Sequence, residues 1–239
     1  MLHFILLMFL GIAAIANAHG GTPVIVPDTM TERVRACTIC HSAEGKAGRD
    51  AYYPRIAGKP HRYLFNQLRN FRDARRYYQP MAILLENMSD EYLLEIAQYF
   101  SSLQLPYPAP EQIDMRPEEI KLAERLVYSG KPEQDIPACS TCHGDSLMGV
   151  EPAIPGLLGL SRAYITAQLS GWHNGGIMRS QTSDCMSDIA QQLTDEEVNA
   201  IAKWLANHVV SGESSSLDVL SPKLVHRCRQ NIQENGGAQ

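Results

Sequence analysis

The pattern Cys-x-x-Cys-His occurs twice in this 239-residue chain and constrains it more than any other feature of the sequence. The six residues concerned are Cys37, Cys40, His41, Cys139, Cys142 and His143. This pattern is the signature of covalent haem attachment, because two thiols three residues apart on a helical turn can reach the two vinyl groups of one porphyrin. The next residue then places an imidazole beneath the iron as proximal ligand. Two motifs predict two covalently bound haems c.

A zinc site or a redox dithiol is the alternative use of a Cys-x-x-Cys pair. Structural zinc would need a matching second pair of ligands within each domain, and no such pair is visible in the sequence. Two complete motifs in one chain therefore favour haem over zinc or dithiol chemistry.

The sequence around the motifs repeats as well, which indicates a duplicated domain. The matched pairs follow in the same order in both copies: Pro54 with Pro155, Gly58 with Gly159, Tyr63 with Tyr164, Gln67 with Gln168, Phe71 with Trp172, Met81 with Met186, and Ser89 with Thr194. A chain of this length suits two domains of about 100 residues each. We expect a first domain at 19–104, a proline-rich linker at 105–116, a second domain at 117–211 and a C-terminal extension at 212–239.

Helical periodicity and cap residues place the same helices in both copies. One helix leads into each motif, from about residue 28 and about residue 117, and a middle helix spans about 61–75 and about 161–172. A last helix follows Ser89 in one copy and Thr194 in the other, each an N-cap residue followed by acidic residues. No run alternates well enough to predict a strand. The predicted fold is all-α, with two tandem helical bundles that each surround a covalent haem.

The first 18 residues resemble a secretory signal peptide. Phe4 to Ile15 is an almost unbroken apolar run, and Ala16-Asn17-Ala18 has the small-x-small pattern of a cleavage site. No Lys or Arg precedes the run, so an uncleaved anchor is the alternative; the run is shorter than the ~20 residues that span a bilayer. We expect cleavage after Ala18 and export to the periplasm.

A haem iron held by histidine needs either a second protein ligand or an open site, and this choice separates carriers from catalysts. Met81 and Met186 occupy matching positions, each in an expected loop eight residues before the N-cap of the last helix. Met88 and Met178 are competitors, but neither has a methionine counterpart in the other copy. Core packing is the ordinary role of methionine, yet the repeat favours Met81 and Met186 as ligands.

These residues together resemble the dihaem cytochromes c of the cytochrome c4 type, built from two class I cytochrome c domains. The resemblance covers about residues 30–210 and rests on both haem motifs, on the segment from Tyr53 to Gly58, and on the matched methionines. It implies His/Met ligation of both haems and electron transfer in the periplasm, often to a terminal oxidase. It also implies that Pro54 and Pro155 lie beside the proximal histidines. Arg76 and Arg179 become candidates for contacting haem propionates, with solvated surface positions as the alternative.

Two further cysteines depart from that pattern. Cys185 directly precedes Met186, and Cys228 lies in the extension, which has no counterpart in the first copy. Unpaired thiols are unusual outside the cytoplasm, so a Cys185–Cys228 disulfide is expected. The alternative is that Cys185 ligates the second iron or acts as a thiolate, as in dihaem cytochromes that oxidise thiosulfate. That alternative would make the protein an enzyme.

We therefore predict an electron-transfer protein with no substrate chemistry of its own. The alternatives are a thiosulfate-oxidising or peroxidase-like cytochrome and an electron-accepting subunit of a dehydrogenase. Expected partners are a membrane oxidase or a dehydrogenase, with peripheral membrane association as a further option. The net charge of −5 argues against nucleic acid. Four other histidines could ligate iron in principle, although surface or packing roles are expected for them: His61, His173, His208 and His226.

Overall fold

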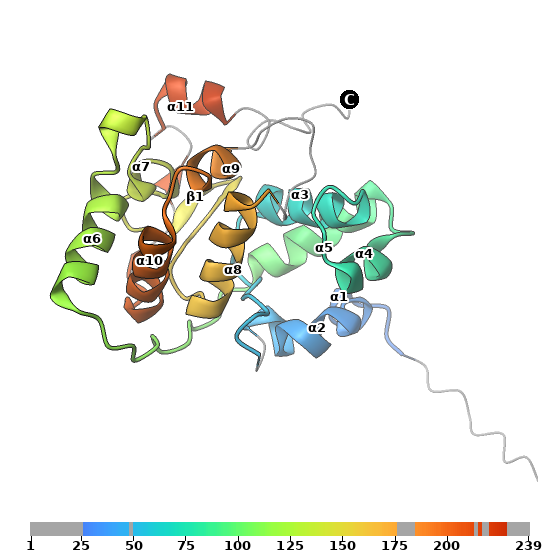
Figure 1. Cartoon of the computed structure of the whole chain (residues 1–239). Helices are drawn as coiled ribbons and strands as arrows, with labels where there is room; N and C mark the ends of the chain where they lie inside the picture. The colour runs from blue at the N-terminus through green and yellow to red at the C-terminus, as the bar shows by residue number, and fades with distance from the viewer. Residues whose placement is uncertain (1–25, 48–49, 176–184, 213–214, 217–219, 229–239) are drawn as a thin grey trace, which may run out of the picture.

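The computed structural model describes residues 26–47, 50–175, 185–212, 215–216 and 220–228. Its helices form two lobes joined by an extended segment, with α1–α5 in one lobe and α6–α10 in the other (Figure 1). The expected signal peptide, Met178, Arg179 and the last residues of the extension lie outside the described residues.

The first lobe contains the three helices expected from the sequence and two that were not distinguished there. Its elements are α1 (Met30–Arg33), α2 (Arg35–His41), the 3-10 turn η1 (Ala43–Gly45), α3 (His61–Arg72), α4 (Gln79–Leu85) and α5 (Asp90–Ser102). Helix α5 begins as predicted, because the Ser89 hydroxyl accepts a hydrogen bond from the Tyr92 amide. Its apolar face, Leu93, Ile96, Ala97 and Phe100, is buried against α3.

The second lobe repeats this arrangement. Its elements are α6 (Pro117–Tyr128), the 3-10 turn η2 (Pro132–Gln134), α7 (Cys139–His143), α8 (Arg162–His173), α9 (Cys185–Ala190) and α10 (Asp195–Asn207). Helix α10 starts in a capping box, in which the Thr194 hydroxyl accepts from the Glu197 amide and the Glu197 carboxylate accepts from the Thr194 amide. The core of this lobe lies where α10 packs against α6 and α8.

Three sequence predictions about elements were wrong in detail. The middle helix of the first lobe ends at Arg72, because Ala74 has a φ of 55° and cannot continue it. Met81 and Met186 lie in short helices, α4 and α9, and not in loops. These helices are only 7 and 6 residues long, too short for a clear apolar period.

A small sheet in the second lobe was not predicted either. It consists of β1 (Gly149–Glu151), β2 (Ile154–Pro155) and β3 (Ser215–Ser216) in the order β2-β1-β3, with β3 parallel to β1. Strands of two or three residues carry no alternation that a sequence could reveal. Since β3 belongs to the C-terminal extension, the sheet joins this extension to the lobe that contains the second haem motif.

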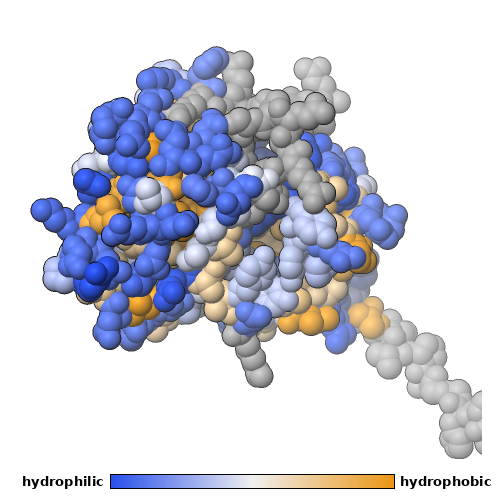
Figure 2. Space-filling view, viewed as in Figure 1, coloured by the Kyte–Doolittle hydropathy of each residue, from blue (hydrophilic) through white to orange (hydrophobic). Residues whose placement is uncertain are grey.

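The two lobes have separate apolar cores, one built from α1–α5 and the other from α6–α10. The visible surface of the molecule is mostly hydrophilic, with apolar residues in small separate areas (Figure 2). None of the helices in the described part of the chain has the length and apolar character needed to cross a bilayer.

Candidate functional site

The first haem motif lies on α2, which presents His41 toward the interior of its lobe. His41 Nδ1 lies 2.9 Å from the carbonyl oxygen of Pro54. A carbonyl can only accept, so Nδ1 donates and Nε2 keeps its lone pair for a metal. Burial lowers the pKa of His41, which the Pro54 contact opposes and the charge of Arg76 reinforces. The Pro54 contact thus orients the imidazole with Nε2 available to bind iron.

The second motif lies on α7 and has the same geometry. His143 Nδ1 donates to the carbonyl oxygen of Pro155 at 2.7 Å, and the ring is buried. Burial is also the main reason for the lowered pKa of His143, and the charge of Lys59 adds to it. The sequence placed both prolines beside the proximal histidines by resemblance, and the structure brings both there.

The motif cysteines suit attachment to a porphyrin. None of the four forms a disulfide in the part of the chain that the structure describes. Burial raises the pKa of Cys37 and raises that of Cys139 to about 12. Ile39, between the two cysteines of the first motif, is 84% exposed. The first motif therefore lies at the surface of its lobe.

Met81 and Met186 occupy equivalent places in their lobes. Each is half-buried and packs against the apolar core of its own lobe. Met88 also packs against the first core, and its carbonyl accepts a hydrogen bond from Arg72 at 3.0 Å. Met88 is thus fixed at the turn before α5, whereas Met81 lies within α4.

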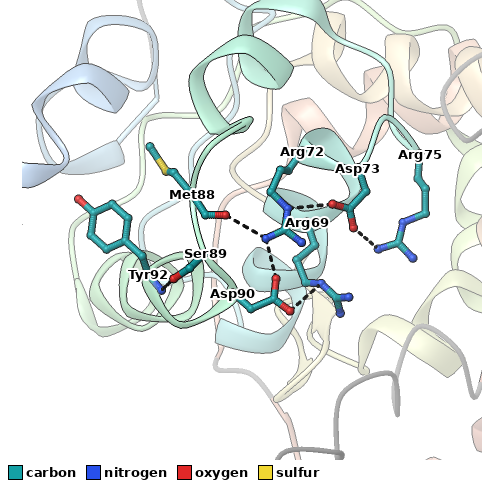
Figure 3. A network of polar contacts seen from close by, with 8 residues as sticks. All are labelled: Arg69, Arg72, Asp73, Arg75, Met88, Ser89, Asp90 and Tyr92. Carbon is teal, nitrogen blue, oxygen red and sulfur yellow. Dashed lines mark hydrogen bonds and ion pairs between the residues drawn. The ribbon is translucent and has the colours of Figure 1, made fainter.

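A network of charged residues, drawn in Figure 3, fixes the turn between α4 and α5 onto the end of α3. Arg72 contacts Asp90 at 2.6 Å and Asp73 at 2.8 Å, and Arg69 lies 3.5 Å from Asp90. Asp73 also pairs with Arg75 at 3.1 Å. Because Asp90 begins α5, this network sets the position of the segment that follows Met81. Sequence reasoning did not single out these residues.

A buried indole and three buried cations indicate that the lobes are built for an anionic group. Trp172 Nε1 is buried and has no hydrogen-bond partner among the described residues. Arg55, Lys59 and Arg76 are 2%, 3% and 9% exposed, and none of them pairs with a carboxylate in the described part of the chain. A buried charge normally has a partner of opposite sign. Haem brings propionate carboxylates, so these residues fit the group that the motifs predict.

Arg76 lies in the contact between the lobes and is not a solvated surface residue. Its guanidinium donates to Gln67 Oε1 at 2.6 Å within its own lobe, and across the contact to Gln168 Oε1 and to the Tyr164 hydroxyl at 3.5 Å. Burial and the neighbouring Tyr164 raise the pKa of Tyr63. Gln67 matches Gln168 and Tyr63 matches Tyr164 in the repeat, so equivalent residues of the two copies meet across the contact.

Two other buried cations, which the sequence did not single out, contact the linker and the second lobe. Arg55 donates to the carbonyl oxygens of Leu105 and Pro106 in the linker, at 2.5 and 2.9 Å, and its guanidinium lies 4.1 Å from the centre of the Tyr107 ring. Lys59 Nζ donates to the carbonyl oxygen of Gly156 at 2.8 Å. Their counterparts in the repeat are Gly156 and Leu160, so the duplication itself gave no signal for them.

The expected disulfide between Cys185 and Cys228 is present. It closes a separation of 43 residues and fixes α11 (Pro222–Arg227) of the extension to the start of α9. Leu220 and Val225 of the extension pack against Val150 of β1. The sulfur of Cys185 is therefore bonded to Cys228, and the alternative in which it is a thiolate ligand does not describe this structure.

The four other histidines of the described residues have other roles or lie at the surface. His173 Nδ1 is 3.0 Å from the carbonyl oxygen of Ala190, and the His208 ring lies 3.5 Å from the ring of Trp204. His61 is half-buried at the start of α3, and His226 is exposed on α11.

The family described as cytochrome c oxidase, cbb3-type, subunit III matches residues 134–205, which include the second motif. A thiosulfate dehydrogenase electron acceptor from Thiomonas intermedia is 37% identical, over 76% of this chain and 82% of that protein. A cytochrome c4 from Pseudomonas aeruginosa is 30% identical, over 84% of this chain and 94% of that protein. The chain belongs to the cytochrome c4 family.

The fold agrees with this membership. The crystal structure of reduced cytochrome c4 from Pseudomonas stutzeri superposes with a TM-score of 0.66 at 27% identity, covering 74% of this chain and 96% of that one. The two-domain class I cytochrome c architecture predicted from the sequence is thus confirmed. As a member of the cytochrome c4 family, the chain is a dihaem electron-transfer protein with two covalently bound haems c, and it works with redox partners.

Proposed function

We propose that this chain is a periplasmic cytochrome c4-type carrier that accepts electrons from a thiosulfate dehydrogenase and delivers them to a terminal acceptor. The similarity to the Thiomonas intermedia protein, a thiosulfate dehydrogenase electron acceptor, carries this proposal, because it extends over 82% of that protein. The carrier itself has no substrate chemistry. Export through cleavage after Ala18 gives it the compartment in which c-type haems are attached.

The residues that hold the haems are those of the two motifs. Cys37 and Cys40 would bind the first porphyrin, and Cys139 and Cys142 the second. Each haem, when bound, supplies a one-electron iron couple. The contact between His41 and Pro54, and its equivalent at His143, orients each imidazole through its Nδ1 proton.

Met81 and Met186 would close the sixth position of each iron. A thioether ligand favours the ferrous state and leaves no open coordination site for thiosulfate or peroxide. The disulfide at Cys185 supports the same assignment, since it removes the thiolate that a cysteine-ligated catalytic haem would need. Both sites therefore suit electron transfer and not substrate turnover.

A reduction assay tests the proposal. Oxidised holoprotein is mixed with thiosulfate and catalytic amounts of a purified thiosulfate dehydrogenase, and the reduced haem band is followed in a stopped-flow instrument. We expect rapid reduction of both haems that depends on both enzyme and thiosulfate. Reduction by thiosulfate alone would instead make the chain itself the enzyme. No reduction in the complete mixture would exclude this donor.

The second candidate function is a carrier that accepts electrons from a different donor. The 30% identity to a cytochrome c4, over 94% of the length of that protein, favours it. Chemically reduced holoprotein would then be reoxidised by oxidase-containing membranes, while thiosulfate dehydrogenase would leave the oxidised form unchanged. Co-sedimentation with those membranes would test peripheral association in the same experiment.

A further inference from the structure

Lys59 is a buried lysine of the first domain that reaches into the second. It lies directly before Pro60 and α3, and its ammonium is hydrogen-bonded to the Gly156 carbonyl, 97 residues away in sequence. It is 3% exposed, and no carboxylate pairs with it in the described ranges. The second-domain side chains that donate to or accept from the first domain, Ser161, Tyr164 and Gln168, are all uncharged.

The group that Lys59 contacts is part of the loop that orients the second proximal histidine. Gly156 follows Pro155, whose carbonyl oxygen accepts the Nδ1 proton of His143 at 2.7 Å. The ammonium of Lys59 is therefore hydrogen-bonded to the residue next to the one that orients His143.

A buried cation near a haem affects the balance between its two oxidation states. Oxidation adds one positive charge at the iron, and a positive charge nearby makes this addition less favourable in a medium of low dielectric constant. The effect shrinks in bulk water, and Lys59 is shielded from water by both domains. Loss of its charge should lower the potential of whichever haem it faces.

We propose that Lys59 of the first domain sets the redox potential of the haem in the second domain. The charge comes from across the domain contact, so the potential of the second haem depends on the docking of the first domain. Burial, followed by the nearby charge of Arg55, lowers the pKa of Lys59 to about 7. A haem propionate is the class of anion that would keep this ammonium charged.

The test is a redox titration of holoprotein variants at neutral pH. K59Q removes the charge and keeps a donor for the Gly156 carbonyl, K59M removes both, and K59R keeps the charge. Each variant is also made in combination with M81H. This substitution changes the spectrum of the first haem, so the two haems can be followed separately. K121Q, at an exposed lysine of α6, is the matched control for loss of one positive charge.

We expect K59Q and K59M to lower the ratio of reduced to oxidised second haem by about tenfold at a fixed ambient potential. This corresponds to about 59 mV for a one-electron couple. The ratio of reduced to oxidised first haem should change by less than about threefold in these variants. In K59R and K121Q, the ratio for the second haem should remain within about twofold of the wild-type value. Haem content and far-ultraviolet circular dichroism establish that each variant has folded.

Three results would overturn the proposal. One is an unchanged redox potential of the second haem in both K59Q and K59M. Another is an equal shift of both haems, which would indicate a general loosening of the domain contact. The third is a wild-type potential in K59Q together with a lowered one in K59M, because the hydrogen bond and not the charge would then be responsible. If K59R does not load haem, the comparison of K59Q with K59M still shows whether the charge of Lys59 sets the potential of the second haem.

Discussion

Cys228 is bonded to Cys185, the residue directly before Met186, so the C-terminal extension is covalently fixed to the helix that carries the second proposed methionine ligand. The extension also adds β3 beside β1 and packs Leu220 against Val150. The disulfide fixes the extension to α9, and the sheet and the apolar contact fix it to β1, an arrangement that the first domain does not have in its described part.

Removing this disulfide should destabilise the second domain. In the chain-entropy model, a bridge across 43 residues contributes roughly 4 kcal/mol, because it restricts the unfolded chain. The double variant C185S/C228S should therefore lose about this much free energy of unfolding in a denaturant titration of the holoprotein. A reductant should destabilise the wild type similarly and leave the double variant unchanged. An effect below about 1 kcal/mol would contradict the chain-entropy estimate.

The proposed methionine ligands can be tested one at a time. M81A and M186A should each leave the sixth coordination position of one iron open. That haem would then show a high-spin signal in near-infrared magnetic circular dichroism and bind added imidazole. M88A is the matched control, because Met88 packs in the same core as Met81 without being a proposed ligand. It should cost about 2 kcal/mol in stability and keep both haems low-spin. If the first haem stays low-spin in M81A and becomes high-spin in M88A, Met88 and not Met81 is the sixth ligand of its iron.

The contact between the domains should depend on Arg76. Its hydrogen bonds to Gln67 and Gln168 are charge-assisted and buried, and R76M would leave these acceptors without a donor. We expect a loss of about 3 kcal/mol in the free energy of unfolding, together with earlier separation of the two domains, measured by small-angle scattering in denaturant. R75M, at a partly exposed ion pair on the same loop, should change stability by less than about 1 kcal/mol.

A pH dependence is expected from Glu119 on α6. The hydrogen bond from Lys203, followed by the amide of Arg116, lowers the pKa of Glu119 to about 2. The folded state therefore binds its proton less readily than the unfolded state, so this contribution to stability is complete above about pH 4.5 and is lost as the pH falls toward 2. E119Q should be less stable than the wild type at pH 7, and the difference should vanish near pH 2. E124Q, at an exposed site on the same helix, should show no such convergence.

The haem motifs, the duplication and most helix starts could be predicted because they depend on residues close together in the chain. Ser89 and Thr194 cap α5 and α10 as expected, since a cap needs only a side chain and an amide three residues later. The short helices α4 and α9 and the three short strands were missed, because two to seven residues carry no measurable period. The network of Arg69, Arg72 and Asp90 was missed because its members come from two helices that only packing brings together.

The cofactor, the number of domains, the matched positions of Met81 and Met186 and the pairing of Cys185 with Cys228 could thus be predicted from residue patterns alone. The positions of the buried cations depend on how the domains pack. Arg76 could have been a surface residue, and Lys59 gave no signal at all, since its counterpart is Leu160. A buried polar group takes its partner from whatever segment the packing places beside it. The partner of Lys59 is a backbone carbonyl, and any residue could have supplied one.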